Sequence, residues 1–419
     1  MNITENKNEI QEEKKLFEVI RDDIKENSDL TALSDKELRE LIDARIAAVA
    51  EKKYMSLRER IKLADTVYSS IRGLGILDLI LDDDLVTEIM INGKDNIFIE
   101  KNGRLEKLEA SFEDDERLEN IIQRIVAKAG REVNQSNPIV DTRLTNGSRV
   151  NVVLPPVALC GPTVTIRKFS KTPMTIEKLI EYGSITEDIA RKLELLVRSK
   201  FNIFISGGTG SGKTTFLNAL SNYIPKDERV ITIEDSAELQ IKGIENLVRL
   251  ETRNANTSGV GEISIRDLIK SSLRMRPERI VVGEVRGAEA IDMLQAMNTG
   301  HDGSLSTGHA NSTHDMLSRL ETMVLQGSAG LPLDAVRQQI ASALDIIIHL
   351  SRMRDHSRKV VEITEVVGYE NGQIRLNPIY KFEEDEKSTI EKVSGSLNRT
   401  ENPLINDFKL KLAGIKEVI

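Results

Sequence analysis

The stretch GGTGSGKTT, at residues 207–215, decides how this sequence of 419 residues is interpreted. It fits the phosphate-binding pattern G-x-x-x-x-G-K-[ST], with the lysine at Lys213 and the hydroxyl residue at Thr214. Glycines let the backbone bend so that successive N–H groups surround phosphate oxygens, while the lysine brings a positive charge to them. We therefore expect the whole stretch to bind nucleotide: Gly207, Gly208, Thr209, Gly210, Ser211, Gly212, Lys213, Thr214 and Thr215.

The flanks of this loop favour the same interpretation. Three apolar residues, 203–205, precede it as a short strand, and Phe216, Leu217 and Leu220 follow it with helical spacing. A strand–loop–helix is the setting that a phosphate-binding loop requires, and the helix directs its positive end at the same anion. The alternative, a flexible glycine linker, explains neither flank. We predict that the ligand is ATP with Mg²⁺, and that Thr214 is one ligand of the metal.

Composition limits the possible classes of protein. Hydrophobic residues make up 39% and charged residues 30%, which is typical of a globular chain, and the length predicts two or more domains. A net charge of −9 argues against a nucleic-acid surface. We find neither an apolar run of the roughly 20 residues that span a bilayer nor a signal-peptide core, so we expect a cytoplasmic protein. The single cysteine, Cys160, is interpreted as a small buried hydrophobic residue.

The order of patterns along the chain predicts four parts. Capping boxes at Ser34 and Ser56 begin two amphipathic helices in the charged first part, and alternating strands around a helix capped by Ser111 mark an α+β domain. The third part alternates strand and helix, as in an α/β domain with a mostly parallel sheet. We place the parts at 1–72 (charged helical module), 73–168 (α+β N-domain), 169–382 (P-loop domain) and 383–419 (polar tail with a short amphipathic segment).

In the third part, apolar runs predict the strands of the sheet. The predicted strands are 203–206, 230–233, 280–282, a short one near Leu305, and 345–350, followed by two antiparallel additions at 360–367 and 374–382.

The first part of the tail, residues 383–402, is polar, and we expect it to be mobile.

Two of these strands end in acids, at Glu234 and at Glu284. Parallel strands present their carboxyl ends at one edge of the sheet, which is also where the phosphate-binding loop lies. We expect one acid to reach Mg²⁺, with Glu284 as the metal candidate, and the other to act on the attacking water, in an order that the sequence leaves open. Gly283 stands where many P-loop enzymes carry an aspartate. The alternative is that both acids only cap the helices that follow.

The stretch NTGHDGSLSTGHANS, residues 298–312, contains His301 and His309 on either side of a short strand. There is no cluster of cysteine and histidine at zinc-ligand spacing, so we interpret His309 as a sensor of the terminal phosphate. For His301 a structural role is equally compatible with the pattern. The other histidines, at 314, 349 and 356, have no motif around them and are interpreted as ordinary.

Arginines complete the candidate site, because phosphoryl transfer is helped by a guanidinium group that reaches the developing charge. The N-domain offers Arg143, Arg149 and Arg167 on strands. A two-residue turn at 146–147 would place Arg143 and Arg149 on opposite faces of the sheet. Further arginines, at 274, 276 and 286, are candidates for subunit contacts. Solvated surface charge is the alternative for each of them.

Four ordered motifs resemble those of one family. GGTGSGKTT, ITIEDSAEL, LRMRPERIVVGEVRGAEA and NTGHDGSLSTGHANS are similar to the Walker A, Asp box, atypical Walker B and His box of the type II/type IV secretion ATPases. The residues within these motifs, together with TRLTNGSRVNVVLPP in the N-domain, are most similar to the CpaF branch, which assembles Tad or type IVc pili. The resemblance covers about residues 70–382.

This resemblance implies a RecA-like P-loop ATPase domain in a homohexameric ring at the inner face of the cytoplasmic membrane. ATP hydrolysis would drive a membrane platform protein that adds or removes pilin subunits. The resemblance also implies that Glu234 and Glu284 are the catalytic and metal-linked acids and that His309 belongs to the His box. It implies in addition that N-domain arginines approach the phosphates, which in this sequence are Arg143, Arg149 and Arg167.

Two other hypotheses remain open. A nucleic-acid translocase with a similar core is disfavoured by the acidic balance and by the 4% aromatic content, because single-strand channels combine basic grooves with stacking rings. A nucleotide-gated scaffold would bind ATP without releasing phosphate. The motifs predict ATP hydrolysis, whereas the pilus assignment follows from the resemblance.

Overall fold

The computed structural model describes residues 16–28, 30, 33–51, 54–101, 103–169, 173–253, 260–328, 330–417 and 419. The chain divides into two compact units, 1–171 and 172–419. The finer division into four parts stays a prediction. Within the described ranges, we find no helix with the length and apolar character needed to cross a bilayer.

The first unit begins with a small helical core. Helices α2 (Asp35–Ala50) and α3 (Leu57–Ile71) start at the two predicted capping boxes, where Ser34 and Ser56 accept from the backbone three residues on. Leu38, Ile42 and Ile46 of α2 are buried against Val67 of α3. The sequence therefore predicted both helix starts and the apolar face of α2 correctly.

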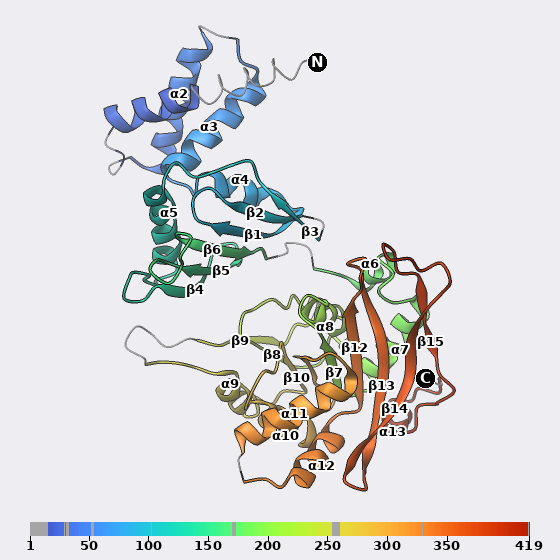
Figure 1. Ribbon diagram of the computed structural model, residues 1–419. Coiled ribbons are helices and arrows are strands. Elements are labelled where there is room, and N and C mark those ends of the chain that lie inside the picture. The colour runs from blue at the N-terminus through green and yellow to red at the C-terminus, as the bar shows by residue number, and fades with distance from the viewer. Residues whose placement is uncertain are drawn as a thin grey trace. The chain divides into compact units, whose positions relative to one another are not determined.

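A six-stranded antiparallel sheet forms the rest of this unit, in the order β3-β2-β1-β6-β5-β4 (Figure 1). Helices α4 (Ile76–Asp82) and α5 (Asp115–Lys128) share its apolar core, because the alternating strand residues and the helical stripes are buried together. The strands are β1 (Val86–Asn92), β2 (Ile97–Lys101), β3 (Arg104–Lys107), β4 (Ile139–Arg143), β5 (Arg149–Val153) and β6 (Thr163–Arg167). The sequence Asn102-Gly103 predicts a hairpin turn between β2 and β3, and Lys101 pairs with Arg104 across it, although residue 102 lies outside the described residues.

Two local predictions in this unit are wrong. Helix α5 begins after Asp114 rather than Ser111, since the Asp114 carboxylate accepts from the Arg117 amide at 2.6 Å. Cys160 is exposed, not buried. It lies in the connection between β5 and β6, outside the strands whose alternate residues face the core, so its apolar character does not decide its position.

The hairpin between β4 and β5 corrects the expected arrangement of the arginines. Arg143 pairs directly with Arg149, because the turn has three residues instead of two. The Leu144 amide donates to the Ser148 carbonyl at 2.9 Å, and Gly147 takes a φ of +87°, the left-handed conformation that closes such a turn. Arg149 in turn pairs with Arg167. All three guanidinium-bearing residues therefore form one row on one face of the sheet.

The second unit is built on a nine-stranded sheet in the order β15-β14-β13-β12-β7-β11-β10-β8-β9. The six strands from β12 to β9 are parallel, and β13 to β15 are added antiparallel, as the sequence predicted for β13 and β14. The strands are β7 (Ile203–Gly207), β8 (Val230–Glu234), β9 (Leu247–Glu251), β10 (Arg279–Val282), β11 (Leu305–His309), β12 (Ile346–Arg352), β13 (Arg358–Glu370), β14 (Gln373–Glu384) and β15 (Gly395–Arg399).

Both faces of this sheet are covered, as expected for central strands that are apolar throughout. Ile203 and Ile205 pack with α7 and α8 on one face, while Phe204 and Ile347 pack with α10 to α12 on the other (Figure 1). The helices are α6 (Ile176–Glu181), α7 (Glu187–Arg198), α8 (Lys213–Ser221), α9 (Ile265–Ser272), α10 (Ala290–Asn298), α11 (Thr313–Gly327), α12 (Leu333–Ala343) and α13 (Phe408–Leu412).

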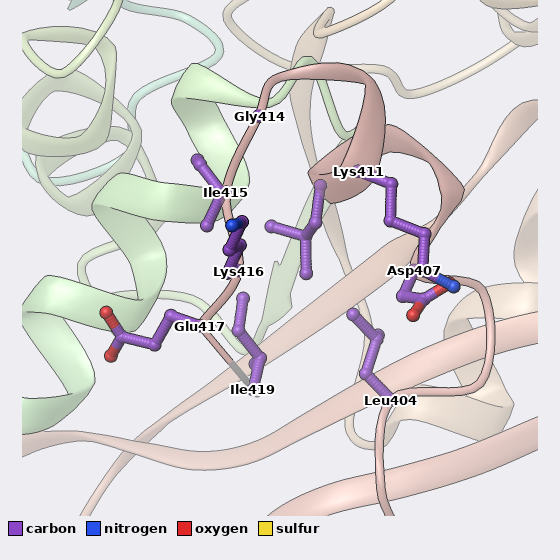
Figure 2. A pocket seen from close by; sticks show the side chains of 9 residues that line it. Leu404, Asp407, Lys411, Gly414, Ile415, Lys416, Glu417 and Ile419 are labelled. Atoms are coloured by element: carbon purple, nitrogen blue, oxygen red, sulfur yellow. The ribbon is translucent and has the colours of Figure 1, made fainter.

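The expectation of a mobile polar tail is wrong for its first part. Strand β14 continues to Glu384, and every residue of β15 pairs with the last part of β14, residues 380–384. Figure 2 shows residues of the final segment around a pocket of about 360 Å³, with Leu404, Ile415 and Ile419 among its lining side chains. Glu417 binds Lys192 of α7 at 2.7 Å. Polar composition did not reveal these backbone pairings and ion pairs.

A buried ion pair lies at the amino end of the central strands. Arg279, with no exposed surface, donates from Nη2 to Glu228 Oε1 at 2.9 Å and from Nη1 to the Val197 carbonyl at 2.6 Å. The adjacent Gly303 has no space for a side chain, since a Cβ there would lie 2.5 Å from Arg279 Nη1. This arginine therefore links the end of α7, the start of β10 and the segment before β11.

We predict that Glu228→Ala destabilises the second unit by about 3–5 kcal/mol, because it leaves the buried Arg279 charge without its carboxylate. Chemical denaturation of the purified protein measures this loss. The matched control is Glu194→Ala, which breaks the exposed pair with Arg198 and should cost less than about 1 kcal/mol. Equal losses in the two variants would contradict this role of the buried pair.

Candidate active site

The phosphate-binding loop connects β7 to α8 at the carboxyl end of the parallel strands. Gly212, with a φ of +91°, directly precedes α8, so the first amides of that helix open toward the loop. Lys213 is buried and Thr214 half-buried at the start of the helix. The sequence predicted this strand–loop–helix correctly, and the arrangement provides N–H donors and one cation for a phosphate.

A chain of polar contacts leads from Lys213 to the acid of the β10 strand. The Lys213 ammonium donates to the Gly208 carbonyl at 2.9 Å and lies 3.2 Å from His309 Nδ1. His309 Nε2 is in turn 2.7 Å from Glu284 Oε1. Burial lowers the pKa of His309, against the opposing effect of Glu284, so a neutral ring accepts from the lysine at Nδ1. The structure thus brings together three residues that the sequence singled out separately.

The second carboxylate oxygen of Glu284, Oε2, binds Arg286. Arg286 donates to Glu284 Oε2 from Nη2 at 2.7 Å and from Nε at 3.0 Å, and it lies 3.7 Å from Asp235. The His309 N–H is poorly aligned with Oε1, and that buried oxygen has no hydrogen-bond donor within the described ranges. Within this chain Arg286, which the sequence also made a candidate for a subunit contact, orients the candidate metal-side acid.

Glu234 lies beside Gly283, the position where many P-loop enzymes carry an aspartate. The register of β8 and β10 aligns Ile233 with Val282, so the next residues are neighbours. A Cβ at Gly283 would lie 3.1 Å from Glu234 Cγ, closer than an ordinary van der Waals contact, so a side chain here would require Glu234 to shift by a few tenths of an ångström. Glu234 Oε1 accepts from the amides of residues 238 and 239 at 2.7 and 2.8 Å, as the capping alternative expected.

The second oxygen of Glu234 has a different environment. Oε2 is buried, and the part of the chain that the structure describes offers it no donor. Burial raises the pKa of Glu234, although the two amide donors act in the opposite direction. A buried carboxylate with one unpaired oxygen and a raised pKa is suited to accept a proton from water. Helix capping therefore accounts for Oε1 of Glu234 but not for Oε2.

A pocket of about 480 Å³ adjoins the loop and contains residues that the sequence did not reveal. Asn311 follows the histidine motif, and Asp315 and Arg319 lie one turn apart on α11, where the i, i+4 spacing gives them one face. That spacing is visible in the sequence, but it does not say which element α11 faces. The lining is Gly208, Thr209, Arg286, His309, Ala310, Asn311, Asp315 and Arg319.

The donors at this site fit Mg²⁺ bound together with a nucleotide. Thr214 provides a hydroxyl and Glu284 a carboxylate with one unpaired oxygen. In the described ranges we find no group of three His, Cys, Asp or Glu side chains arranged to hold a metal. Mg²⁺ is commonly held by one or two protein ligands, substrate phosphates and waters, so such a group is not required.

Other candidates are placed elsewhere. His301 Nδ1 lies 3.2 Å from the Ala296 carbonyl at the end of α10, which supports its structural interpretation. Arg143, Arg149 and Arg167 belong to the first unit.

Comparison with known proteins identifies the family. The model of the family described as type II/IV secretion system protein matches residues 72–400. The chain belongs to this family. The match covers the N-domain sheet and all the motifs of this secretion ATPase family that were quoted from the sequence.

Individual relatives agree with this assignment. A Mycobacterium tuberculosis protein named for conjugal transfer is 36% identical over 301 residues, which are 70% of this chain and 85% of the relative. The type IV secretion system protein VirB11 of Brucella suis is 33% identical, over 64% of this chain and 82% of its own. The crystal structure of the Yersinia pseudotuberculosis ATPase DotB has a TM-score of 0.50 at 18% identity, covering 69% of this chain and 78% of DotB. The predicted α/β P-loop fold is confirmed.

We predict that Gly283→Ala lowers the turnover number at least about tenfold with little change in nucleotide affinity. The added Cβ displaces Glu234, and a misplaced catalytic group costs rate more than binding. Steady-state phosphate release and fluorescent-nucleotide titration measure the two effects. Gly300→Ala is the control, because nothing lies within 4 Å of its Cβ position, although its φ of +95° adds some strain. Unchanged turnover in Gly283→Ala would contradict the packing of Glu234 over this glycine as a functional constraint.

Proposed function

We propose that this protein hydrolyses ATP at the site around Lys213. The observation that supports the proposal is the continuous contact from Lys213 through His309 to Glu284. A terminal phosphate would replace His309 as the partner of the Lys213 ammonium, and the change would reach the acid at the end of β10. In this proposal His309 would act as the sensor of the terminal phosphate.

The two acids take different roles in this proposal. Glu234 accepts the proton of the attacking water through its unpaired Oε2, because its pKa is raised. Glu284, which already has a cationic partner in Arg286, orients water on the metal side. Bound Mg²⁺ supplies charge stabilisation to the phosphates and the leaving oxygen. Thr214 and the amides at the start of α8 would hold the phosphates in place.

The arginine row of the first unit would complete the site. Arg143, Arg149 and Arg167 occupy adjacent positions on β4, β5 and β6. We propose that these residues approach the nucleotide of the same or a neighbouring subunit.

At the level of the cell, we propose a cytoplasmic homohexamer at the inner face of the membrane that powers Tad (type IVc) pilus assembly, retraction or secretion. The resemblance of the motifs to the CpaF branch and membership of the secretion family support this proposal. Its partners would be the inner-membrane platform proteins of the pilus. Direct binding of nucleic acid is not expected from the net charge of −9.

We predict that Glu234→Gln lowers the turnover number by about 100-fold or more while nucleotide still binds, since the proton acceptor is lost. In the wild-type protein, turnover should fall on acidification at a pH above the ordinary glutamate value of about 4.3, because the carboxylate must be ionised to act. Lys213→Ala should abolish binding or turnover, and Glu284→Gln should stop turnover without preventing binding.

Phosphate release and nucleotide titration at several pH values measure these effects. Binding without phosphate release by the wild-type protein would favour the nucleotide-gated scaffold. Hydrolysis that needs nucleic acid and depends steeply on salt would favour the translocase. Intact kinetics in Lys213→Ala would refute the site.

Action of the arginines in trans can be tested by mixing variants. If Arg149 serves a neighbouring subunit, mixtures of Arg149→Ala and Lys213→Ala proteins recover activity that neither has separately, because some shared sites then hold both residues. At a 1:1 ratio, roughly a quarter of the sites would be complete. Mixing Lys213→Ala with Lys213→Ala/Arg149→Ala protein is the control, and absence of recovery in the first mixture would contradict action in trans.

A further inference from the structure

One buried histidine is not used by the proposed mechanism. His349 lies in β12, 7% exposed, on the same strand face as the buried Ile347. In the sequence it has no motif around it, and it was interpreted as ordinary. A buried imidazole needs hydrogen-bond partners, and the identity of these partners is informative.

The two partners of His349 belong to the two nucleotide motifs. His349 Nδ1 lies 2.7 Å from the hydroxyl of Ser206, the residue directly before Gly207, and β12 pairs with β7 in that register. The ring also bonds the backbone carbonyl of Asn311, two residues after His309. Burial lowers the pKa of His349, so a neutral ring accepts from Ser206 at Nδ1 and donates from Nε2 to Asn311. Glu362, Asp315 and Lys213 are the charged groups near it.

The bond to Asn311 fixes the start of α11. Asn311 precedes Ser312, whose side chain accepts from the Asp315 amide at 3.0 Å as the N-cap of that helix. Helix α11 carries Asp315 and Arg319 into the wall of the pocket beside the loop. The position of that wall relative to Gly207 is therefore set by this imidazole together with the β7–β11 pairing, after which the Ala310 amide donates to the Gly207 carbonyl at 3.2 Å.

We propose that His349 is a positioning residue that couples occupancy of the phosphate-binding loop to the segment from His309 to Arg319. A nucleotide that orders the loop fixes Ser206, and the imidazole transmits this restriction to Asn311 and the first turn of α11. The inference deepens the proposed function and rests on nucleotide binding at Lys213. An apolar ring of the same size would fill the space but would keep neither hydrogen bond, so the connection from the loop to this segment would be left to the β7–β11 pairing.

Three variants separate the two bonds. His349→Phe removes both; His349→Asn retains a polar atom near the Nδ1 position, toward Ser206; and His349→Gln retains one near the Nε2 position, toward Asn311. His314→Phe is the matched control, since His314 is an exposed histidine on α11, the helix that the bond to Asn311 positions. The measurements are titration with a fluorescent ATP analogue and hydrogen–deuterium exchange of residues 309–319 with and without Mg²⁺ and a non-hydrolysable ATP analogue.

We expect the nucleotide to slow exchange of this segment in the wild-type and His314→Phe proteins. In His349→Phe the analogue should bind within about threefold of wild-type affinity, but the protection of 309–319 should decrease about tenfold, the effect of losing a hydrogen bond of about 1.4 kcal/mol. His349→Gln should keep more protection than His349→Asn, a comparison that decides the question if the phenylalanine variant does not fold.

Full protection in His349→Phe, or equal protection in the glutamine and asparagine variants, would overturn the positioning role. A protection loss as large in His314→Phe would do the same. Failure of the wild-type protein to bind the analogue would instead overturn the proposed nucleotide site. The two failures are therefore distinguishable, and neither depends on measuring hydrolysis.

Discussion

The site depends on the contact between the Lys213 ammonium and the neutral ring of His309. A buried cation beside a phosphate-binding loop needs a partner, and the imidazole provides one without the repulsion that a second positive charge would cause. Because the opposite side of the ring contacts Glu284, the lysine and the carboxylate are not independent. In the proposed function, an anion that takes the lysine away from His309 would change the surroundings of the acid, and the contact would then report the presence of nucleotide.

Strand order is what makes this contact possible. Strand β7 lies between β12 and β11, and β10 and β8 follow in the same parallel arrangement, so the carboxyl ends that carry the motifs meet at one edge. The glycine at 283 lets Glu234 pack directly over the end of β10. Two acids from separate strands thereby reach one small region, each with one buried oxygen that finds no donor in the described ranges. Such oxygens are costly unless water or a metal-bound ligand satisfies them.

Local patterns predicted much of this arrangement, whereas contacts between elements were harder to predict. The loop, the two acids and seven of the nine strands of the second unit were predicted, because each depends on a few adjacent residues, whereas β9 and β15 were not predicted. The arginine row was missed because a three-residue turn, closed by Gly147, shifts the pairing by one residue and reverses the expected faces. His349, Asp315 and Arg319 carry no local signal, since their importance arises from the strands and helices that pack against them. The tail was misjudged because polar composition does not exclude backbone pairing on an edge strand.

We propose that Lys213 exchanges His309 for the terminal phosphate when nucleotide binds. A crystal structure with Mg²⁺ and a non-hydrolysable ATP analogue, at a resolution that places individual side chains, would show this exchange. We expect Lys213 Nζ to lie within hydrogen-bond distance of a terminal phosphate oxygen and no longer to contact His309 Nδ1, with ordered water or metal at Glu234 Oε2 and Glu284 Oε1. A bound triphosphate with the lysine still on His309, or with both carboxylates remote from the phosphates, would contradict it.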